Sequence, residues 1–160
     1  MLDKQYYMFK KRENVADIEE GKLLSPKFDN DGLIPVVTTC FKTKEILMHG
    51  YMNVEALKLT IEKKEAHYWS RSRKEIWHKG KTSGFVQKIK EIRIDDDQDC
   101  VWLRVDVKGG ASCHVGYRSC FYRSIPLNNN ASKVVLKFEE SEKVFDPDDI
   151  YGDAPNPTKL

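Results

Sequence analysis

Short runs of β-branched and apolar residues, separated by turn signals, fill most of the sequence from residue 33 to residue 125. The clearest run is 101–107, where aliphatic residues alternate with polar or aromatic ones, as in a strand with one buried face. Helical spacing of apolar residues occurs over 54–64, directly after Asn53, which is a good N-cap. Further strands are expected at 33–41, 46–51, 66–71, 75–79, 85–94 and 121–125. The pattern predicts an α+β fold, with a mostly antiparallel sheet and one main helix.

The two ends of the sequence differ from this middle part. Residues 1–32 are polar and mixed, with one short helix expected at 14–20. Residues 128–160 begin with a loop and become rich in Pro and Asp from residue 146, which predicts poor order in that last part. We therefore expect an N-terminal segment (1–32), one domain (33–127) and a C-terminal extension (128–160).

The composition is that of a soluble globular protein. A chain of 160 residues, with 40 % hydrophobic and 32 % charged residues, suits one domain with one core. No stretch approaches the roughly 18 apolar residues of a transmembrane helix, and the first residues lack the apolar part of a secretory signal. We expect a cytoplasmic protein with no membrane partner. The net charge of +2 is less one-sided than that of most nucleic-acid-binding proteins, so we expect no nucleic-acid partner.

Cys113 and Cys120 lie seven residues apart and bracket His114 and Gly116. Thiolate and imidazole ligands favour Zn²⁺. There is one such pair, and its spacing is wider than that of zinc fingers. We therefore expect three protein ligands and an open position, which is the arrangement of a catalytic zinc site. The alternative is two buried cysteines beside a surface histidine, and the spacing alone does not decide between the two.

A run of acidic residues contains Asp95, Asp97 and Asp99, which would project from one face if the run were a strand. Three neighbouring carboxylates repel one another unless a cation neutralises them, and hard oxygen ligands suit Mg²⁺ or Ca²⁺. The run does not continue as an EF-hand loop, because Cys100 stands where that loop needs glycine. The alternative is an acidic turn that faces solvent.

A third group of residues combines cations, hydroxyls and aromatic rings near two glycines. Arginine offers a planar fork for phosphate, and hydroxyl and backbone N–H groups add hydrogen-bond donors. Trp77 could stack on a base or fill the core. The candidate substrate-binding residues are Arg71, Arg73, Trp77, Lys79, Thr82 and Ser83.

Taken together, these segments resemble the phosphoribosyl-AMP cyclohydrolase family of histidine biosynthesis. The matching strings are Met52 to Leu57, Tyr68 to Arg73, Trp77 to Gly84 with Gln87, Asp95 to Asp99, and Cys113 to Phe121. They occur in the family's order and at nearly its spacing. The resemblance covers roughly residues 33–126.

The resemblance implies an intertwined homodimer with active sites at its interface. Each subunit would bind one zinc ion, with Cys113 and Cys120 among the ligands, and Mg²⁺ on Asp95, Asp97 and Asp99. The family's third zinc ligand is a cysteine between the first two of those aspartates, at the position that Asp96 occupies here.

This departure leaves two candidates for the third zinc ligand. Asp96 holds the expected position, and zinc accepts carboxylate oxygen. Cys100 has the better ligand chemistry, but it would lie about 13 Å from Asp96 on a straight strand. We favour Asp96 slightly. A second departure is Lys81, where the family commonly has glutamate.

The resemblance also implies the reaction, which opens the adenine ring of 1-(5-phosphoribosyl)-AMP at the N1–C6 bond. Zinc-bound hydroxide would attack C6, and His114 is the candidate for proton transfer. Mg²⁺ would help to neutralise and orient the substrate phosphate. Two other functions compete with this one: a zinc-stabilised nucleic-acid-binding module, and a hydrolase of a different N-substituted purine.

Overall fold

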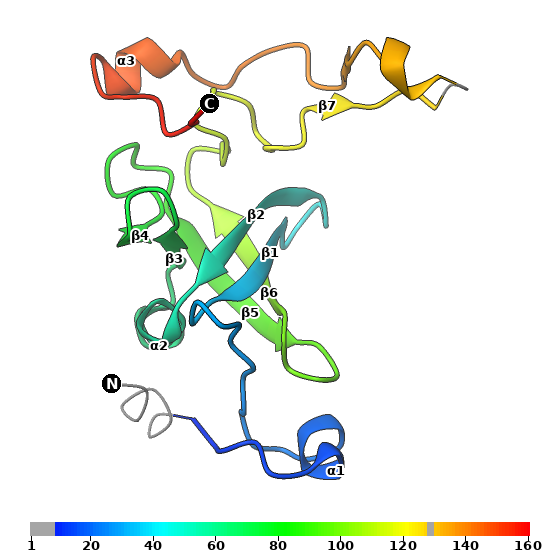
Figure 1. Ribbon diagram of the computed structural model, residues 1–160. Helices are drawn as coiled ribbons and strands as arrows, with labels where there is room; N and C mark the ends of the chain where they lie inside the picture. The colour runs from blue at the N-terminus through cyan, green and yellow to red at the C-terminus, as the bar shows by residue number, and fades with distance from the viewer. Residues whose placement is uncertain (1–8, 128–129) are drawn as a thin grey trace.

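The structure is a computed structural model that describes residues 9–127 and 130–160. Its centre is a four-stranded sheet in the order β2–β1–β6–β5 (Figure 1). The strands are β1 (Ile34–Cys40), β2 (Ile46–Met52), β5 (Gln87–Ile94) and β6 (Val101–Val107). The pairs β1–β2 and β5–β6 are antiparallel hairpins, and β1 runs parallel to β6 where the two hairpins meet.

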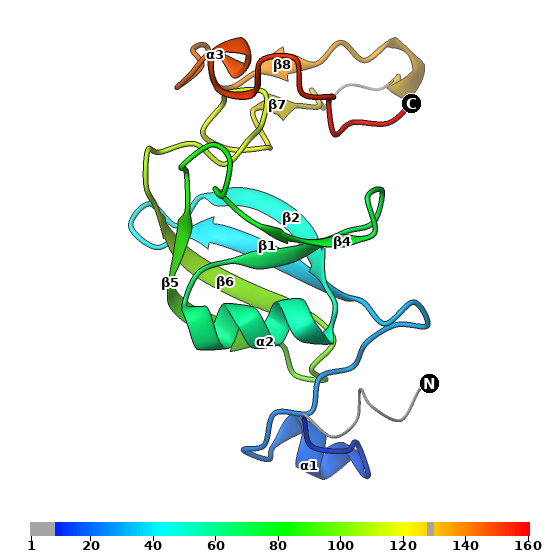
Figure 2. The ribbon, with the colours of Figure 1, turned by 90° about the vertical axis from the view of Figure 1, so that its left-hand side faces the viewer.

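One face of the sheet is covered by helix α2 (Val54–Lys63) and a small hairpin of β3 (His67–Ser70) and β4 (Glu75–His78) (Figure 2). The Asn53 side chain accepts the N–H of Ala56 at 2.8 Å, as expected of an N-cap. Apolar side chains of the sheet, the helix and the hairpin form the core between them. Its most deeply buried members include Ile34, Val36, Met52, Leu57, Tyr68, Leu103 and Val105.

The chain continues beyond both ends of the sheet (Figure 1). Helix α1 (Val15–Glu19) lies at one end. At the other end, β7 (Arg123–Ser124) pairs with β8 (Lys137–Phe138), and a 3-10 turn (Ala131–Lys133) lies between them. Helix α3 (Pro147–Tyr151) follows in the tail. No helix in the described ranges is long and apolar enough to cross a membrane.

The α+β class and the mostly antiparallel pairing are confirmed, with one main helix at the expected place. Three details differ from the expectation. The β1–β6 contact is parallel, and only residues 123–124 of the expected strand 121–125 are paired. In the tail, where poor order was expected, Asp146 caps a short helix that has Pro147 at its start, a favourable position for proline. The boundaries of the three expected segments stay predictions.

Candidate active site

Residues 111–120, the cysteine loop, follow β6 and fold back on themselves. Two backbone hydrogen bonds close the loop, from Ser112 N–H to Arg118 O and from Cys113 N–H to Tyr117 O, at 3.0 and 3.2 Å. Cys120 N–H donates to Leu47 O at 2.7 Å, which ties the loop to β2. This arrangement brings the Cys113 and Cys120 side chains into hydrogen-bond contact.

The two thiols strongly affect each other's ionisation. The hydrogen bond from Cys120 lowers the pKa of Cys113, and the same bond, together with burial, raises the pKa of Cys120. A thiolate and a thiol that share a proton in this way form a soft ligand pair. Zinc prefers such sulfur ligands, so the pair fits this metal.

Lys79 is 5 % exposed and lies beneath the cysteine loop. Its Nζ donates to Ser112 O at 2.6 Å and lies 4.9 Å from the centre of the Trp77 ring. Burial lowers the pKa of Lys79, while the nearby charges of Cys120 and Cys113 act in the opposite direction. Lys79 was expected to bind substrate phosphate, and within this chain its ammonium group lies close to the two thiols.

His114 is half-buried, and its Nε2 is buried with no hydrogen-bond partner in the described part of the chain. Burial and the charge of Lys79 lower the pKa of this imidazole, and a hydrogen bond with the Asn156 side chain raises it. The ring therefore lies close to the C-terminal tail.

Within the described residues of one chain, no third ligand joins the two cysteines. Among the described residues, the only group of three or more His, Cys, Asp or Glu side chains close enough to share a metal ion is Asp95, Asp97 and Asp99. Asp96 and Cys100 lie before β6, and the cysteine loop lies after it. A strand of that length separates the two ends by roughly 20 Å, and Figure 1 shows them at opposite ends of the β5–β6 hairpin.

The aspartates lie in a turn between β5 and β6, so the expectation that they lie on a strand is wrong. Asp95 Oδ1 accepts the N–H groups of Asp99 and Cys100 at 2.9 and 3.0 Å, which reverses the chain. The ligand oxygens of Asp95, Asp97 and Asp99 lie within 4.8 Å of one another. A hydrogen bond with Asp95 raises the pKa of Asp99, and burial adds to the shift. The negative charges of Asp95 and Asp97 also raise the pKa of Asp99. A bound cation relieves such repulsion between carboxylates.

Gln98 is a residue of this turn that sequence reasoning missed. It is buried and has a left-handed φ of 58°. Its side chain accepts Ser25 N–H at 2.7 Å and donates to Ile18 O at 3.0 Å. Arg12 donates to Asp97 O at 2.8 Å. The N-terminal segment therefore holds the aspartate turn from outside the sheet, a role for which a single buried glutamine gives no periodic signal.

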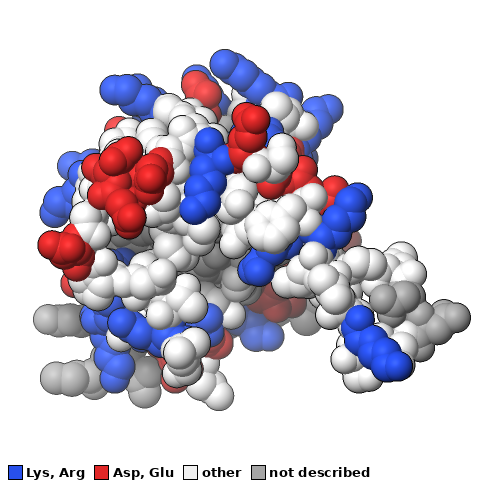
Figure 3. Space-filling view, turned by 90° about the horizontal axis from the view of Figure 1, so that it is seen from above, with Lys and Arg blue, Asp and Glu red and all other residues white. Residues whose placement is uncertain are grey.

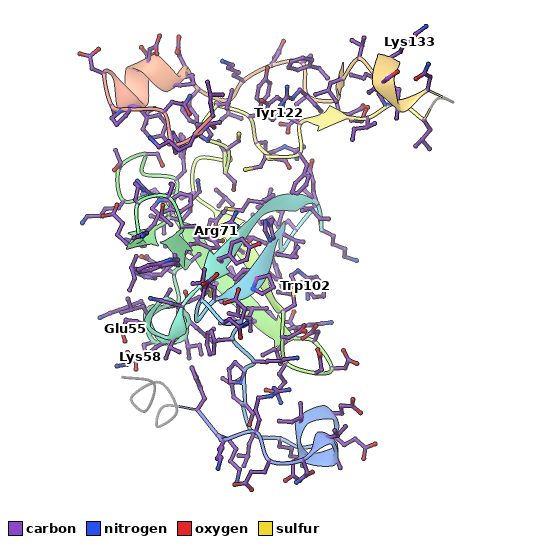
Figure 4. The ribbon with its side chains drawn as sticks, in the orientation of Figure 1. Glu55, Lys58, Arg71, Trp102, Tyr122 and Lys133 are labelled. Atoms are coloured by element: carbon purple, nitrogen blue, oxygen red, sulfur yellow. The ribbon has the colours of Figure 1, made fainter. Side chains whose placement is uncertain are left out.

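The candidate substrate residues fall into two places. Arg71 and Arg73 lie in the β3–β4 turn, where their guanidinium groups stand over Tyr51 at 4.2 Å and Trp77 at 5.7 Å (Arg71 is labelled in Figure 4). Thr82 and Ser83 lie in the loop after β4, at the other end of that strand. Trp77 packs against the core rather than standing free. The two groups of residues therefore lie at the two ends of a strand of four residues.

A buried polar chain connects the sheet to the cysteine loop, and it too was missed from the sequence. Thr38 and the Tyr68 hydroxyl are 2.7 Å apart, and that hydroxyl donates to Gln87 Oε1 at 2.6 Å. Gln87 Nε2 donates to Ser112 Oγ at 3.1 Å. Burial raises the pKa of Tyr68. The signal available in the sequence was a glutamine, Gln87, within an otherwise strand-like run, and the structure shows that it is fully buried.

The sheet face opposite α2 carries a mostly apolar groove beside the aspartate turn. Trp102, labelled in Figure 4, lies on this side, and its Nε1 donates to Thr39 Oγ1 at 2.8 Å. Arg93 stacks 5.1 Å above the Trp102 ring. The groove is lined by Val37, Thr39, Ile46, Arg93, Ile94, Asp95, Cys100 and Trp102. Both an aspartate of the turn and Cys100 thus border an apolar surface.

Comparison with known proteins gives consistent matches. Residues 48–122, which include the aspartate turn and the cysteine loop, match the family described as phosphoribosyl-AMP cyclohydrolase. A protein of that name from Rhodopseudomonas palustris is 53 % identical over 136 residues, which cover 85 % of this chain and 89 % of the relative. Another, from Rhizobium leguminosarum, is 48 % identical over 141 residues, covering 88 % and 93 %.

Proposed function

Because the chain belongs to the phosphoribosyl-AMP cyclohydrolase family, we propose that it hydrolyses the N1–C6 bond of 1-(5-phosphoribosyl)-AMP in histidine biosynthesis. The observation that carries this proposal is the 53 % identity to the Rhodopseudomonas palustris protein over 136 residues. The matched family region, residues 48–122, contains both the cysteine loop and the aspartate turn. We also propose a cytoplasmic location, as expected for a biosynthetic enzyme of this kind.

Zinc is the proposed metal of the cysteine loop. Cys113 and Cys120 already contact each other, and Lys79 lies beneath them as a counter-charge. The metal would supply a water molecule of lowered pKa as the nucleophile at neutral pH. The chain's own part is to hold the two thiols in place, through the closed loop and its bond to β2.

The third zinc ligand is proposed to come from a second copy of the chain, with Asp96 favoured over Cys100. Support comes from the separation of the two ends of β6 and from the groove, which offers an apolar surface next to Asp95 and Cys100. A homodimer that buries this groove would bring each aspartate turn to the cysteine loop of its partner. Each active site would then contain residues of both subunits.

The aspartate turn is the proposed Mg²⁺ site. Asp95, Asp97 and Asp99 supply converging oxygen atoms, the ligands that Mg²⁺ prefers. The candidate phosphate ligands are Arg71, Arg73, Thr82 and Ser83. They lie at the two ends of β4, a strand of four residues.

His114 is the proposed proton-transfer residue. Its Nε2 is buried and has no partner in the described part of the chain, so it is free to hold or donate a proton. Ring opening requires that the departing N1 nitrogen receive a proton as the C6–N1 bond breaks. A neutral imidazole kept in that form by burial suits this exchange near neutral pH.

The direct test is incubation of the purified protein with phosphoribosyl-AMP, with product detected by mass as the gain of one water, together with zinc analysis. We expect turnover and about one zinc per chain. Cys113→Ala should lose both zinc and turnover. Cys40→Ala, which removes a thiol outside the cysteine loop, is the matched control and should keep both. Absence of turnover by the zinc-loaded protein, or turnover only of another N-substituted purine, would contradict the proposal.

The third ligand is tested separately by comparing Asp96→Ala with Cys100→Ala. We expect Asp96→Ala to lose zinc and Cys100→Ala to retain it, since Asp96 holds the position of the family's ligand. Anomalous scattering at the zinc edge in crystals identifies the bonded atom. Zinc retained at full occupancy in both variants would exclude both candidates.

A further inference from the structure

The C-terminal extension crosses the cysteine loop. Figure 1 shows this orange part of the chain above the sheet, at the end where the loop lies. The N–H groups of Glu139 and Glu140 both donate to Tyr122 O, at 2.8 and 3.3 Å. Val144 N–H donates to Gly116 O at 2.7 Å. Backbone hydrogen bonds therefore fix the extension both to the turn of the loop and to the segment that follows the loop.

Glu140 directs its carboxylate at the backbone of the loop. Its Oε1 accepts Arg118 N–H at 3.0 Å, and its Oε2 accepts Ser119 N–H at 3.1 Å. Each carboxylate oxygen thus takes one of two successive N–H groups. A hydrogen bond to a charged acceptor is stronger than one between neutral groups. Glu140 therefore restrains the backbone directly before Cys120.

Glu140 differs in its surroundings from the other acidic residues of the extension. Its side chain is 16 % exposed, and it is the only Asp or Glu among the described residues 130–160 that is not exposed. Asp148 and Asp149 of α3, for example, are exposed. Figure 3 looks onto this end of the molecule and shows acidic side chains gathered at the left, where α3 lies. A carboxylate withdrawn from water needs hydrogen bonds in place of its hydration, and the loop supplies them to Glu140.

The backbone around Cys120 is held from two sides. On the side of the sheet, Cys120 N–H donates to Leu47 O at 2.7 Å. On the side of the extension, Glu140 bonds the two residues before Cys120. An N–H group that loses its partner in a partly buried place costs free energy, so the backbone moves to regain one. Without the carboxylate, Cys120 would therefore shift relative to Cys113.

The turn of the loop fits the extension just as closely. Gly116 has a φ of 105°, and a Cβ atom at this position would lie 2.4 Å from Phe145 O. The next residue, Tyr117, is buried, and its ring stacks on that of Tyr122 with the ring centres 4.0 Å apart. The extension thus contacts the loop at its turn as well as next to Cys120.

We propose that Glu140 is a positioning residue of the candidate zinc site, whose carboxylate holds the backbone before Cys120 so that this thiol stays beside Cys113. The inference rests on the zinc site of the proposed function. Glu140 acts through the backbone of Arg118 and Ser119. Because ligands that are already in place lose less freedom when a metal binds, zinc affinity is the quantity that this carboxylate raises.

The test is the zinc dissociation constant of the purified full-length protein, measured by competition with a chromophoric chelator. We expect Glu140→Ala to raise it about 10–100-fold, as for other residues that orient metal ligands. Glu140→Gln should raise it less, since the amide keeps one acceptor oxygen but presents an NH₂ group to the second N–H. Glu139→Ala is the matched control and should bind zinc as wild type does, because this neighbouring carboxylate bonds Ser124 and Lys137 rather than the loop.

Amide hydrogen exchange in the zinc-free proteins gives a second readout. The amides of Arg118 and Ser119 should exchange faster in Glu140→Ala than in wild type, and at the wild-type rate in Glu139→Ala. If Glu140→Ala does not fold, Glu140→Gln and Glu139→Gln give the same comparison.

Wild-type zinc affinity in Glu140→Ala would overturn the proposal, and so would an equal loss in Glu139→Ala. A lowered Tm with unchanged zinc affinity would also overturn it, since that pattern means a purely structural role. The measurement does not depend on turnover. If wild type binds zinc but does not convert phosphoribosyl-AMP, the proposed reaction fails, while the zinc affinity of Glu140→Ala still decides the role of Glu140.

Discussion

At the scale of single residues, the pairing of Cys113 with Cys120 has a consequence for stability. Their hydrogen bond favours the thiolate form of Cys113 and the thiol form of Cys120. In the unfolded chain both thiols titrate at the ordinary pKa of roughly 8.5. Folding therefore changes the proton affinity of the two residues in opposite directions.

In the zinc-free protein, we predict that the free energy of unfolding rises with pH up to about 8.5. Because the pKa of Cys113 is lowered, the unfolded state binds more protons in this range. This stabilisation is complete above the ordinary thiol pKa and is lost as the pH falls through the lowered one. Above about pH 8.5 the raised pKa of Cys120 reverses the trend.

Urea unfolding at several pH values, with zinc removed by a chelator, measures this dependence. Cys113→Ala removes the lowered pKa, so its stability should vary less with pH below about 8.5. Equal pH dependence in the two proteins would mean that the thiols do not interact as described.

His114 and Cys113 are adjacent residues, but we predict different effects of replacing them. His114→Ala should keep its zinc and lose kcat by about 10²–10⁴-fold, as expected for a proton-transfer residue. Cys113→Ala should lose both zinc and turnover, because one of two thiol ligands is gone. Metal analysis and steady-state kinetics on the same samples separate the two cases. An unchanged kcat in His114→Ala would leave this residue a structural role only.

At the scale of elements, the aspartate turn depends on a segment far away in the sequence. Gln98 connects the turn to the backbone of Ser25 and Ile18, and Arg12 adds a bond to Asp97 O. The three carboxylates repel one another, so their convergence relies on such external bonds. The N-terminal segment thereby supports the proposed Mg²⁺ site.

We predict that Gln98→Gly lowers the free energy of unfolding by about 1–3 kcal/mol, because buried hydrogen-bond partners lose their bonds. Glycine tolerates the left-handed φ of 58°, so the change isolates the side chain. Lys74→Gly, at an exposed position with φ of 53°, is the matched control and should be neutral or slightly stabilising. Urea unfolding compares the two, and a Gln98→Gly protein as stable as wild type would refute this role.

The sequence predicted most elements, since periodicity and turn residues act locally. The helix after Asn53 and the strands 101–107 and 46–51 follow from side-chain spacing. Two kinds of feature did not follow. The alternating aspartates were interpreted as part of a strand. That pattern does not show that the Asp95 side chain accepts the backbone N–H groups four and five residues later, which makes the segment a turn. The parallel pairing of β1 with β6 joins segments far apart in the sequence, and neither segment's residue pattern indicates its partner.

For the candidate site, too, local features could be predicted from the sequence and long-range contacts could not. The cysteine and aspartate groups are visible as composition and spacing, and the resemblance assigned their metals. The burial of Lys79 and Gln87 depends on which segments the fold brings together. No periodic signal reports a long-range polar contact made by a single residue.

At the scale of the whole molecule, the proposed zinc site needs two copies of the chain. One chain places two thiols at one end of β6 and the candidate third ligands at the other. The groove with Trp102 lies on the sheet face opposite α2, beside those candidates. The central claim is that zinc is shared between subunits and that the shared site opens the adenine ring.

A heterodimer of two inactive subunits tests that claim most directly. One subunit carries Cys113→Ala, and the other carries Asp96→Ala together with Cys100→Ala, so neither homodimer has an intact zinc site. Differently tagged chains are co-expressed, and the heterodimer is isolated through both tags. Shared sites leave one of the two intact, so we predict about half of the wild-type turnover of phosphoribosyl-AMP. A heterodimer without zinc and without turnover, or full activity in the Asp96→Ala, Cys100→Ala homodimer, would contradict the account.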